Sequence, residues 1–133
     1  MKILVIDDQA TVRKAMCIVL RKLGFSDITE ADSGNRAMAC LDKKQFDLVI
    51  SDMHMPAPDS GGPAKSGLDV LQYVKTHPRL KDTPFLMVTT DAEMKTIVQA
   101  MQRGVNGYIV KPFTEASVKE KLDMLGFLAN AAA

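Results

Sequence analysis

The sequence is poor in cysteine and aromatic residues and has almost no net charge. Its two cysteines, Cys17 and Cys40, form neither a CxxC pair nor a ligand cluster, so we expect both to be reduced packing residues. The 17 Lys and Arg residues nearly balance the 16 Asp and Glu residues, which argues against nucleic acid or a membrane surface as a partner. No apolar run approaches the roughly 20 residues of a membrane span, and the first one ends at Asp7, too early for a signal peptide. These absences predict one cytoplasmic globular domain.

Short continuous apolar runs alternate with segments of helical periodicity along the chain. Such runs are typical of parallel strands covered on both faces. The predicted strands lie at 3–6, 28–31, 47–50, 85–88 and 108–110, and the predicted helices at 12–23, 35–43, 68–75, 92–103 and after the N-cap Thr114. The pattern predicts an α/β fold, a (βα)5 doubly wound parallel sheet whose ligands would collect beyond the carboxyl ends of the strands.

One segment interrupts this alternation. Residues 53–66 contain three prolines and two glycines without apolar periodicity, so they predict a loop about two to three times the usual length. It is either a lid or docking surface or a tolerated insertion. We expect one domain over 1–128, a frayed tail over 129–133 and no output domain.

Acidic residues follow two of the predicted strands. Asp7 and Asp8 come directly after the first strand, and Asp52 follows the third. If these strands are neighbours, three carboxylates converge and repel one another unless a cation neutralises them. A hard divalent ion such as Mg²⁺ fits this donor set and leaves room for a phosphoryl group. A solvated acidic rim or a helix N-cap is the simpler interpretation of Asp7 and Asp8 alone.

Two further polar residues end strands at the same predicted edge. Lys111 follows the fifth strand and precedes Pro112, and Thr89 ends the fourth strand. Lys111 could offer a point charge to a phosphoryl oxygen, and Thr89 could offer a hydroxyl. Taken singly, Lys111 could be a surface lysine and Thr89 a strand residue. Together with the acidic residues, they place suitable polar side chains at the ends of four separate strands. Because such a coincidence is improbable, a phosphoryl site is the more specific interpretation.

Four blocks of sequence resemble the receiver domain of two-component response regulators, nearest to the single-domain chemotaxis (CheY-like) type. The blocks are 3–8, 52–56, 89–92 and 107–113. The resemblance implies the flavodoxin-like strand order 2-1-3-4-5, which is the order known for this fold. It also implies that a sensor histidine kinase or phosphotransfer protein phosphorylates Asp52.

Roles for the remaining site residues follow from the same resemblance. It implies that Asp7, Asp8, Asp52 and the backbone carbonyl of His54 hold Mg²⁺, and that Lys111 pairs with the phosphoryl oxygens. Thr89 would bond to the phosphoryl group after transfer, and Tyr108 would change rotamer in response. An unknown downstream protein would dock on the fourth helix, fifth strand and fifth helix of a monomer. Candidate docking residues are Met94, Ile97, Val98, Gln99, Met101, Gln102, Tyr108, Lys119 and Lys121, unless the apolar ones pack in the core.

Three residues near the site are expected to tune the lifetime of an acyl phosphate. His54 and Asp91 occupy positions that border the path of water in this family, although His54 could also be a solvent-facing side chain without a role. Thr90 is bulkier than the small residue common beside the switch threonine, so we expect slower hydrolysis.

Two other functions remain open on the sequence. A receiver-like module could bind partners without phosphorylation, but such modules usually lose an acidic or lysine position that this chain keeps. A dehalogenase-like phosphatase would need a DxD run after the first strand, whereas the chain has Asp7-Asp8-Gln9. A phosphoacceptor switch, rather than an enzyme, is therefore the leading interpretation.

Overall fold

The computed structural model describes residues 1–55 and 64–127, and within them five parallel strands form one sheet in the order β2-β1-β3-β4-β5. The strands are β1 (Lys2–Ile6), β2 (Asp27–Ala31), β3 (Leu48–Ser51), β4 (Phe85–Thr89) and β5 (Gly107–Val110). The helices are α1 (Ala10–Lys22), α2 (Gly34–Lys43), α3 (Gly67–Thr76), α4 (Met94–Gln102) and α5 (Glu115–Met124). The predicted doubly wound α/β fold and strand order are confirmed. Most of the predicted loop over 53–66, and the tail over 129–133, lie outside the described residues.

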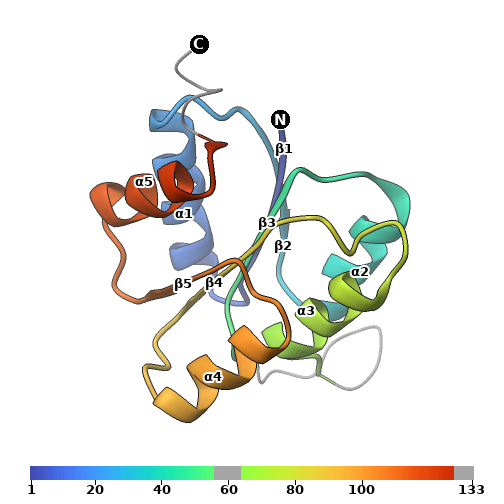
Figure 1. The fold of residues 1–133 in the computed structure, drawn as a ribbon. Helices are drawn as coiled ribbons and strands as arrows, with labels where there is room; N and C mark the ends of the chain where they lie inside the picture. The colour runs from blue at the N-terminus through green and yellow to red at the C-terminus, as the bar shows by residue number, and fades with distance from the viewer. Residues whose placement is uncertain (56–63, 128–133) are drawn as a thin grey trace.

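Helices cover both faces of the sheet and divide the core in two. Helices α1 and α5 pack on one face, and α2, α3 and α4 lie on the other (Figure 1). Neighbouring residues of β1 point into opposite cores, because Ile3 packs with the α1 and α5 side and Leu4 with the α2 and α3 side. This two-sided burial explains why the strands are continuously apolar in sequence.

The register of the sheet places the residues after β1 and β3 side by side. Ile6 pairs with Ser51 at the carboxyl ends of these strands. The ladder then extends by one step, since the Asp52 N–H donates to the Ile6 carbonyl at 3.0 Å. Across the sheet, the Lys111 N–H donates to the Thr89 carbonyl at 2.7 Å. The polar residues beyond the strands therefore meet at one edge.

Some helix ends follow local sequence signals, whereas the starts of α1 and α4 do not, since neither Gln9 nor Glu93 caps its helix with a side chain. Thr114 caps α5 as predicted, its hydroxyl accepting the Ser117 N–H, and Gly24 follows α1 with a φ of 102°. Helix α4 begins at Met94 rather than at the predicted Ala92. The Asp91 carboxylate accepts the Glu93 N–H at 3.0 Å, which holds these residues in a turn before the helix.

Both cysteines are free thiols, Cys17 buried and Cys40 half-buried, as expected of packing residues. Within 1–55 and 64–127, none of the helices has the length and apolar character needed to cross a membrane.

Gly67 supports the segment that follows β3. Its N–H donates to the Met53 carbonyl at 2.7 Å, and a Cβ atom at this position would lie 2.1 Å from the Asp52 carbonyl oxygen. We predict that Gly67→Ala lowers the free energy of unfolding by about 3 kcal/mol, because the backbone must move apart to admit the methyl group. Urea denaturation measures this difference.

Gly126→Ala is the matched control. No atom lies within 4 Å of a Cβ there, so the left-handed φ of +85° should cost about 1 kcal/mol by itself. Equal destabilisation by the two substitutions would contradict the role of close approach at Gly67.

Candidate functional site

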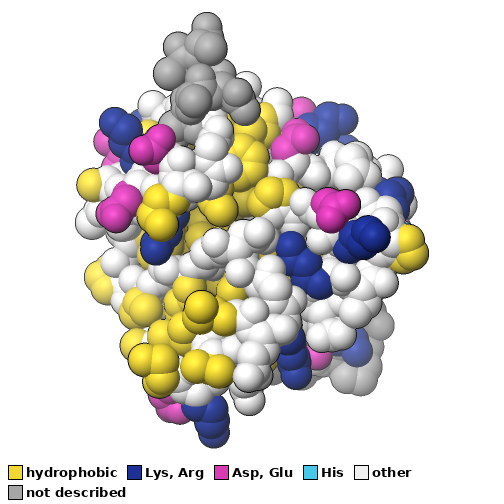
Figure 2. Space-filling model, in the orientation of Figure 1, with side chains coloured by type: hydrophobic (Ala, Val, Ile, Leu, Met, Phe, Trp, Pro, Cys, Tyr) yellow, Lys and Arg dark blue, Asp and Glu magenta, His cyan; other side chains and the backbone are white. Residues whose placement is uncertain are grey.

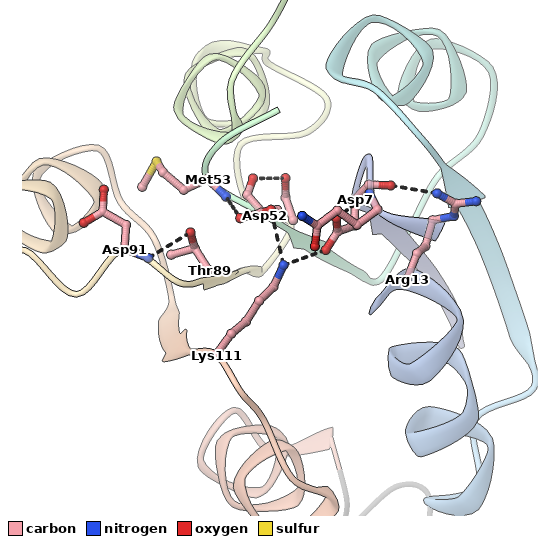
Figure 3. A network of polar contacts seen from close by, with 9 residues as sticks. Asp7, Arg13, Asp52, Met53, Thr89, Asp91 and Lys111 are labelled. Carbon is pink, nitrogen blue, oxygen red and sulfur yellow. Dashed lines mark hydrogen bonds and ion pairs between the residues drawn. The ribbon is translucent and has the colours of Figure 1, made fainter. Parts of the chain in front are cut away.

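Three carboxylates meet at the carboxyl edge of the sheet, as the sequence predicts. One oxygen from each of Asp7, Asp8 and Asp52 lies within 4.8 Å of the other two. Asp7 is 5% exposed and Asp52 8% exposed, so neither belongs to a solvated acidic rim. Figure 3 shows the side chains of Asp7 and Asp52 directed toward each other from the ends of neighbouring strands.

Lys111 bridges two of these carboxylates. Its ammonium nitrogen lies 2.8 Å from Asp7 Oδ2 and 3.3 Å from Asp52 Oδ2, and its side chain is 8% exposed (Figure 3). Burial disfavours the charged form of Lys111, but the hydrogen bond to Asp7 and the charges of Asp52 and Asp7 outweigh it and raise the pKa. Lys111 is therefore a buried cation aimed into the acid cluster, which excludes the surface-lysine interpretation.

The remaining charge favours a bound cation. Burial, and then repulsion by Asp7 and Asp52, raise the pKa of Asp8, so one ammonium group does not balance the three carboxylates. Clustered carboxylate oxygens are the donors that hard divalent ions prefer. The residues present thus fit Mg²⁺, with Asp7, Asp8 and Asp52 as the side chains that could hold it.

Backbone groups fix the direction of the two buried carboxylates. The Gln9 N–H donates to Asp7 Oδ1 at 2.9 Å, and the Met53 N–H donates to Asp52 Oδ1 at 2.7 Å. The Ser51 hydroxyl donates to the Asp52 carbonyl at 2.8 Å. The other oxygen of Asp52, Oδ2, accepts a hydrogen bond from the Lys111 ammonium group.

The other predicted residues gather around Asp91 in the turn between β4 and α4. The Asp91 N–H donates to Thr89 Oγ1 at 3.3 Å, and the Tyr108 hydroxyl donates to the Asp91 carbonyl at 2.7 Å. His54 Nε2 lies 2.7 Å from Asp91 Oδ2, although the His54 side chain is 61% exposed. Burial, and then the charges of Asp91 and Asp52, raise the pKa of Tyr108 to about 12.

Thr90 lies apart from both groups. It is exposed and lines an open, mainly apolar groove of about 430 Å³ between the start of α1 and the residues after β5. Lys111, Pro112 and Phe113 line the same groove. Thr90 can therefore act on the approach to Lys111, not on the acid cluster directly.

The structure also decides between core packing and exposure for the apolar residues of α4. Met94, Val98 and Met101 are exposed and lie at helical spacing, and Val110 is exposed on neighbouring β5. Figure 2 shows hydrophobic side chains gathered over the region of α4. Ile97 and Tyr108 are half-buried, while Gln99, Gln102 and Lys119 are exposed and Lys121 is half-buried. We call Met94, Val98, Met101 and Val110 the α4–β5 patch.

Arg13 is a site residue that the sequence reasoning missed. It donates to the Asp7 carbonyl at 2.8 Å and to Glu30 Oε1 at 2.9 Å, and its side chain is 14% exposed (Figure 3). A signal was available, because Arg13 lies three residues before the buried Met16 and so on the inward face of α1. It ties the turn carrying Asp7 to β2.

Comparisons with known proteins agree with this geometry. The family model of the response regulator receiver domain matches residues 3–123. The chain is 45% identical over 125 residues to chemotaxis protein CheY-3 of Vibrio cholerae, covering 94% of this chain and 91% of that one. It is 42% identical to chemotaxis protein CheY of Pseudomonas aeruginosa, over 94% of this chain and 95% of that one.

A solved structure shows the same fold. The chemotaxis response regulator CheY4 of Vibrio cholerae superposes with a TM-score of 0.81 at 28% identity, covering 93% of this chain and 97% of that one. The sheet order and the acid cluster define a doubly wound α/β domain with a polar site at its switch point. The chain belongs to the response regulator receiver domain family, and within it resembles the CheY-type chemotaxis proteins.

The ion pair of Arg13 with Glu30 gives a testable pH dependence. The hydrogen bond from Lys14, and then the one from Arg13, outweigh burial and lower the pKa of Glu30. A carboxyl group whose pKa is lowered by folding stabilises the protein at pH values above the usual Glu pKa. This stabilisation is lost as the pH falls through the folded-state pKa. We predict that Arg13→Met costs about 2 kcal/mol at pH 7 and less below about pH 4, in urea denaturation at several pH values.

Lys14→Met is the control for this substitution. Lys14 pairs with the same Glu30 carboxylate at 2.9 Å, but its side chain is 61% exposed, so its loss should cost about 0.5 kcal/mol. If both substitutions are equally destabilising, the buried bond to the Asp7 turn contributes nothing.

Proposed function

We propose that this receiver domain is a phosphoacceptor switch in which Asp52 takes a phosphoryl group from a phosphohistidine of a sensor histidine kinase or phosphotransfer protein. The observation that carries the proposal is the Lys111 ammonium between the buried Asp7 and Asp52 carboxylates. A buried cation beside a buried nucleophilic carboxylate is suited to neutralising phosphoryl oxygens as they arrive. The CheY-type relatives support chemotaxis as the setting.

Transfer requires positioning and neutralisation rather than acid or base chemistry. A carboxylate oxygen of Asp52 bonds to phosphorus as the P–N bond of the phosphohistidine breaks, and the imidazole leaves with the electron pair and gains a proton from solvent. The Met53 N–H holds Asp52 Oδ1, and Lys111 faces Oδ2. Lys111 can pair with the negative oxygens of a phosphoryl group on Asp52, because its ammonium group already lies within hydrogen-bond distance of Asp52 Oδ2.

A divalent ion completes the site in this proposal. Asp7, Asp8, Asp52 and the backbone carbonyl of His54 would hold Mg²⁺. When bound, Mg²⁺ supplies positive charge that offsets the phosphoryl oxygens. Arg13 contributes indirectly by fixing the Asp7 carbonyl and hence the acidic turn.

Signalling would follow from new contacts of the phosphoryl group. Thr89 is fully buried at the end of β4, and its hydroxyl can turn from Asp91 toward an oxygen on Asp52. The Tyr108 hydroxyl donates a hydrogen bond to the Asp91 carbonyl in the same turn, so a movement of the turn would weaken or break this bond. A ligand that contacts one arrangement better than the other shifts the equilibrium between them.

The α4–β5 patch is the proposed docking surface for a downstream protein, together with helix α5. It begins three residues after Asp91, so the turn that senses the phosphoryl group leads directly into it. We further propose a cytoplasmic monomer that binds no nucleic acid. His54, Thr90 and Asp91 are proposed to set the acyl phosphate lifetime, since His54 and Asp91 contact each other close to Asp52 and Thr89, and Thr90 lines a groove with Lys111.

Phosphorylation by a small acyl phosphate in the presence of Mg²⁺ tests the acceptor. Mass spectrometry should detect one added phosphoryl group on the wild type and none on Asp52→Asn, whose amide is not a nucleophile. Lys111→Met should slow the reaction by roughly 100-fold, because the neutralising cation is lost. Asp123→Asn, an exposed α5 carboxylate, is the control and should react normally.

Two outcomes would favour the other functions. Repeated turnover of phosphomonoesters would indicate a phosphatase. An unphosphorylated chain that binds its partner as tightly as the loaded form would indicate an interaction module.

Capture of partner proteins tests the docking surface. The beryllofluoride-loaded chain should retain at least tenfold more of its partner than the chain without beryllofluoride, and Met101→Lys should abolish this gain because a charge enters an apolar contact. Ile18→Lys, at an exposed apolar residue of α1, should retain it. Loss of capture in Ile18→Lys alone would move the docking surface to the α1 face.

A further inference from the structure

Asp91 contacts three of the predicted site residues, Thr89, Tyr108 and His54. Its N–H donates to Thr89 Oγ1 at 3.3 Å, and its carbonyl accepts the Tyr108 hydroxyl at 2.7 Å. Its carboxylate contacts His54 Nε2 at 2.7 Å and accepts the Glu93 N–H at 3.0 Å. Figure 3 shows the bond between Asp91 and Thr89. One residue thus contacts both the Thr89 hydroxyl and the Tyr108 hydroxyl.

His54 connects that turn to the acceptor. It lies two residues after Asp52, in the segment that leaves β3, whereas Asp91 follows β4. The contact between them joins two loops that flank the acid cluster. Because a carboxylate only accepts, the ring nitrogen of His54 that faces Asp91 carries the hydrogen.

The pair is poorly placed to serve stability. The His54 ring is 61% exposed, and an ion pair with such exposure adds little to folding. The Asp91 carboxylate, in contrast, is 13% exposed and is held from both sides by His54 and Glu93. A contact that is weak for folding is still sufficient to bias two arrangements of a loop by a few-fold.

We propose that the His54–Asp91 pair is a clasp that keeps the Thr89 hydroxyl and the Tyr108 ring on the Asp91 turn, so that Asp91 is a positioning residue of the switch. This inference rests on the proposed function. Engagement of Thr89 with a group on Asp52 withdraws it from the Asp91 N–H and disturbs the Tyr108 bond, so the turn must shift. The clasp opposes that shift by tying the turn to the segment that follows Asp52.

The chain offers a direct probe of this equilibrium. It has two tyrosines and no tryptophan, so 3-fluorotyrosine gives two fluorine resonances, with Tyr73 on α3 as the internal reference for Tyr108. The experiment records these resonances without ligand and during titration with beryllofluoride and Mg²⁺. Bound fluoride gives its own resonance and reports loading of Asp52 separately.

His54→Ala and Asp91→Ala should each move the ligand-free Tyr108 resonance toward its loaded position. Each should also lower the half-saturating beryllofluoride concentration by about threefold. The double substitution should go no further than Asp91→Ala alone, because Asp91→Ala already removes the contact with His54 together with the bond to the Glu93 N–H. His54→Gln keeps an N–H donor and should restore the wild-type resonance, which a general loosening of the loop would not do.

His77→Ala is the matched control, since His77 is the chain's other histidine and contacts Arg79 at the end of α3. It should leave the Tyr108 resonance and the titration unchanged. The Tyr73 resonance is expected to shift in this variant alone, because the His77 ring lies 5.6 Å from the Tyr73 ring. An unmoved ligand-free Tyr108 resonance in His54→Ala, or additive effects in the double substitution, would overturn the clasp. Absence of a bound-fluoride resonance would overturn the proposed function instead, and the ligand-free spectra would still decide the clasp.

Discussion

The Lys111 ammonium between the carboxylates of Asp7 and Asp52 is the interaction on which the site depends. Three carboxylates within 4.8 Å repel one another, and a buried charge without a partner costs several kcal/mol, of order 3–5. Lys111 offsets part of this repulsion and leaves a deficit of positive charge that a divalent ion can fill. The same excess of negative charge that strains the site makes its oxygen donors suited to a divalent cation.

This arrangement depends on the order of the strands. Asp7 and Asp52 are neighbours because β1 pairs with β3, and Lys111 reaches them from β5 across the end of β4. Thr89 therefore lies between Lys111 and the turn that carries Asp91 (Figure 3). The Asp52 carboxylate and the exposed surface of α4 are joined by a path of a few residues, all at one edge of the sheet.

Local patterns predicted the elements closely, and the site only in part. Continuous apolar runs indicated the strands, and Thr114 and Gly24 marked helix ends correctly. The start of α4 was wrong, because the Asp91 carboxylate holds a turn that periodicity does not report. Arg13 was missed, since its partners Asp7 and Glu30 come from different strands that the sequence does not place together.

The sequence by itself determined the βα alternation, the polar residues that end the strands and the family that their pattern resembles, because these depend on residue type and spacing. Only the tertiary structure decided that Lys111 is buried, that Met94 and Met101 are exposed, and that Thr89, Tyr108 and His54 meet at Asp91. Periodicity assigns a side chain to one face of an element. Whether another element covers that face depends on long-range packing, which spacing along the chain does not encode.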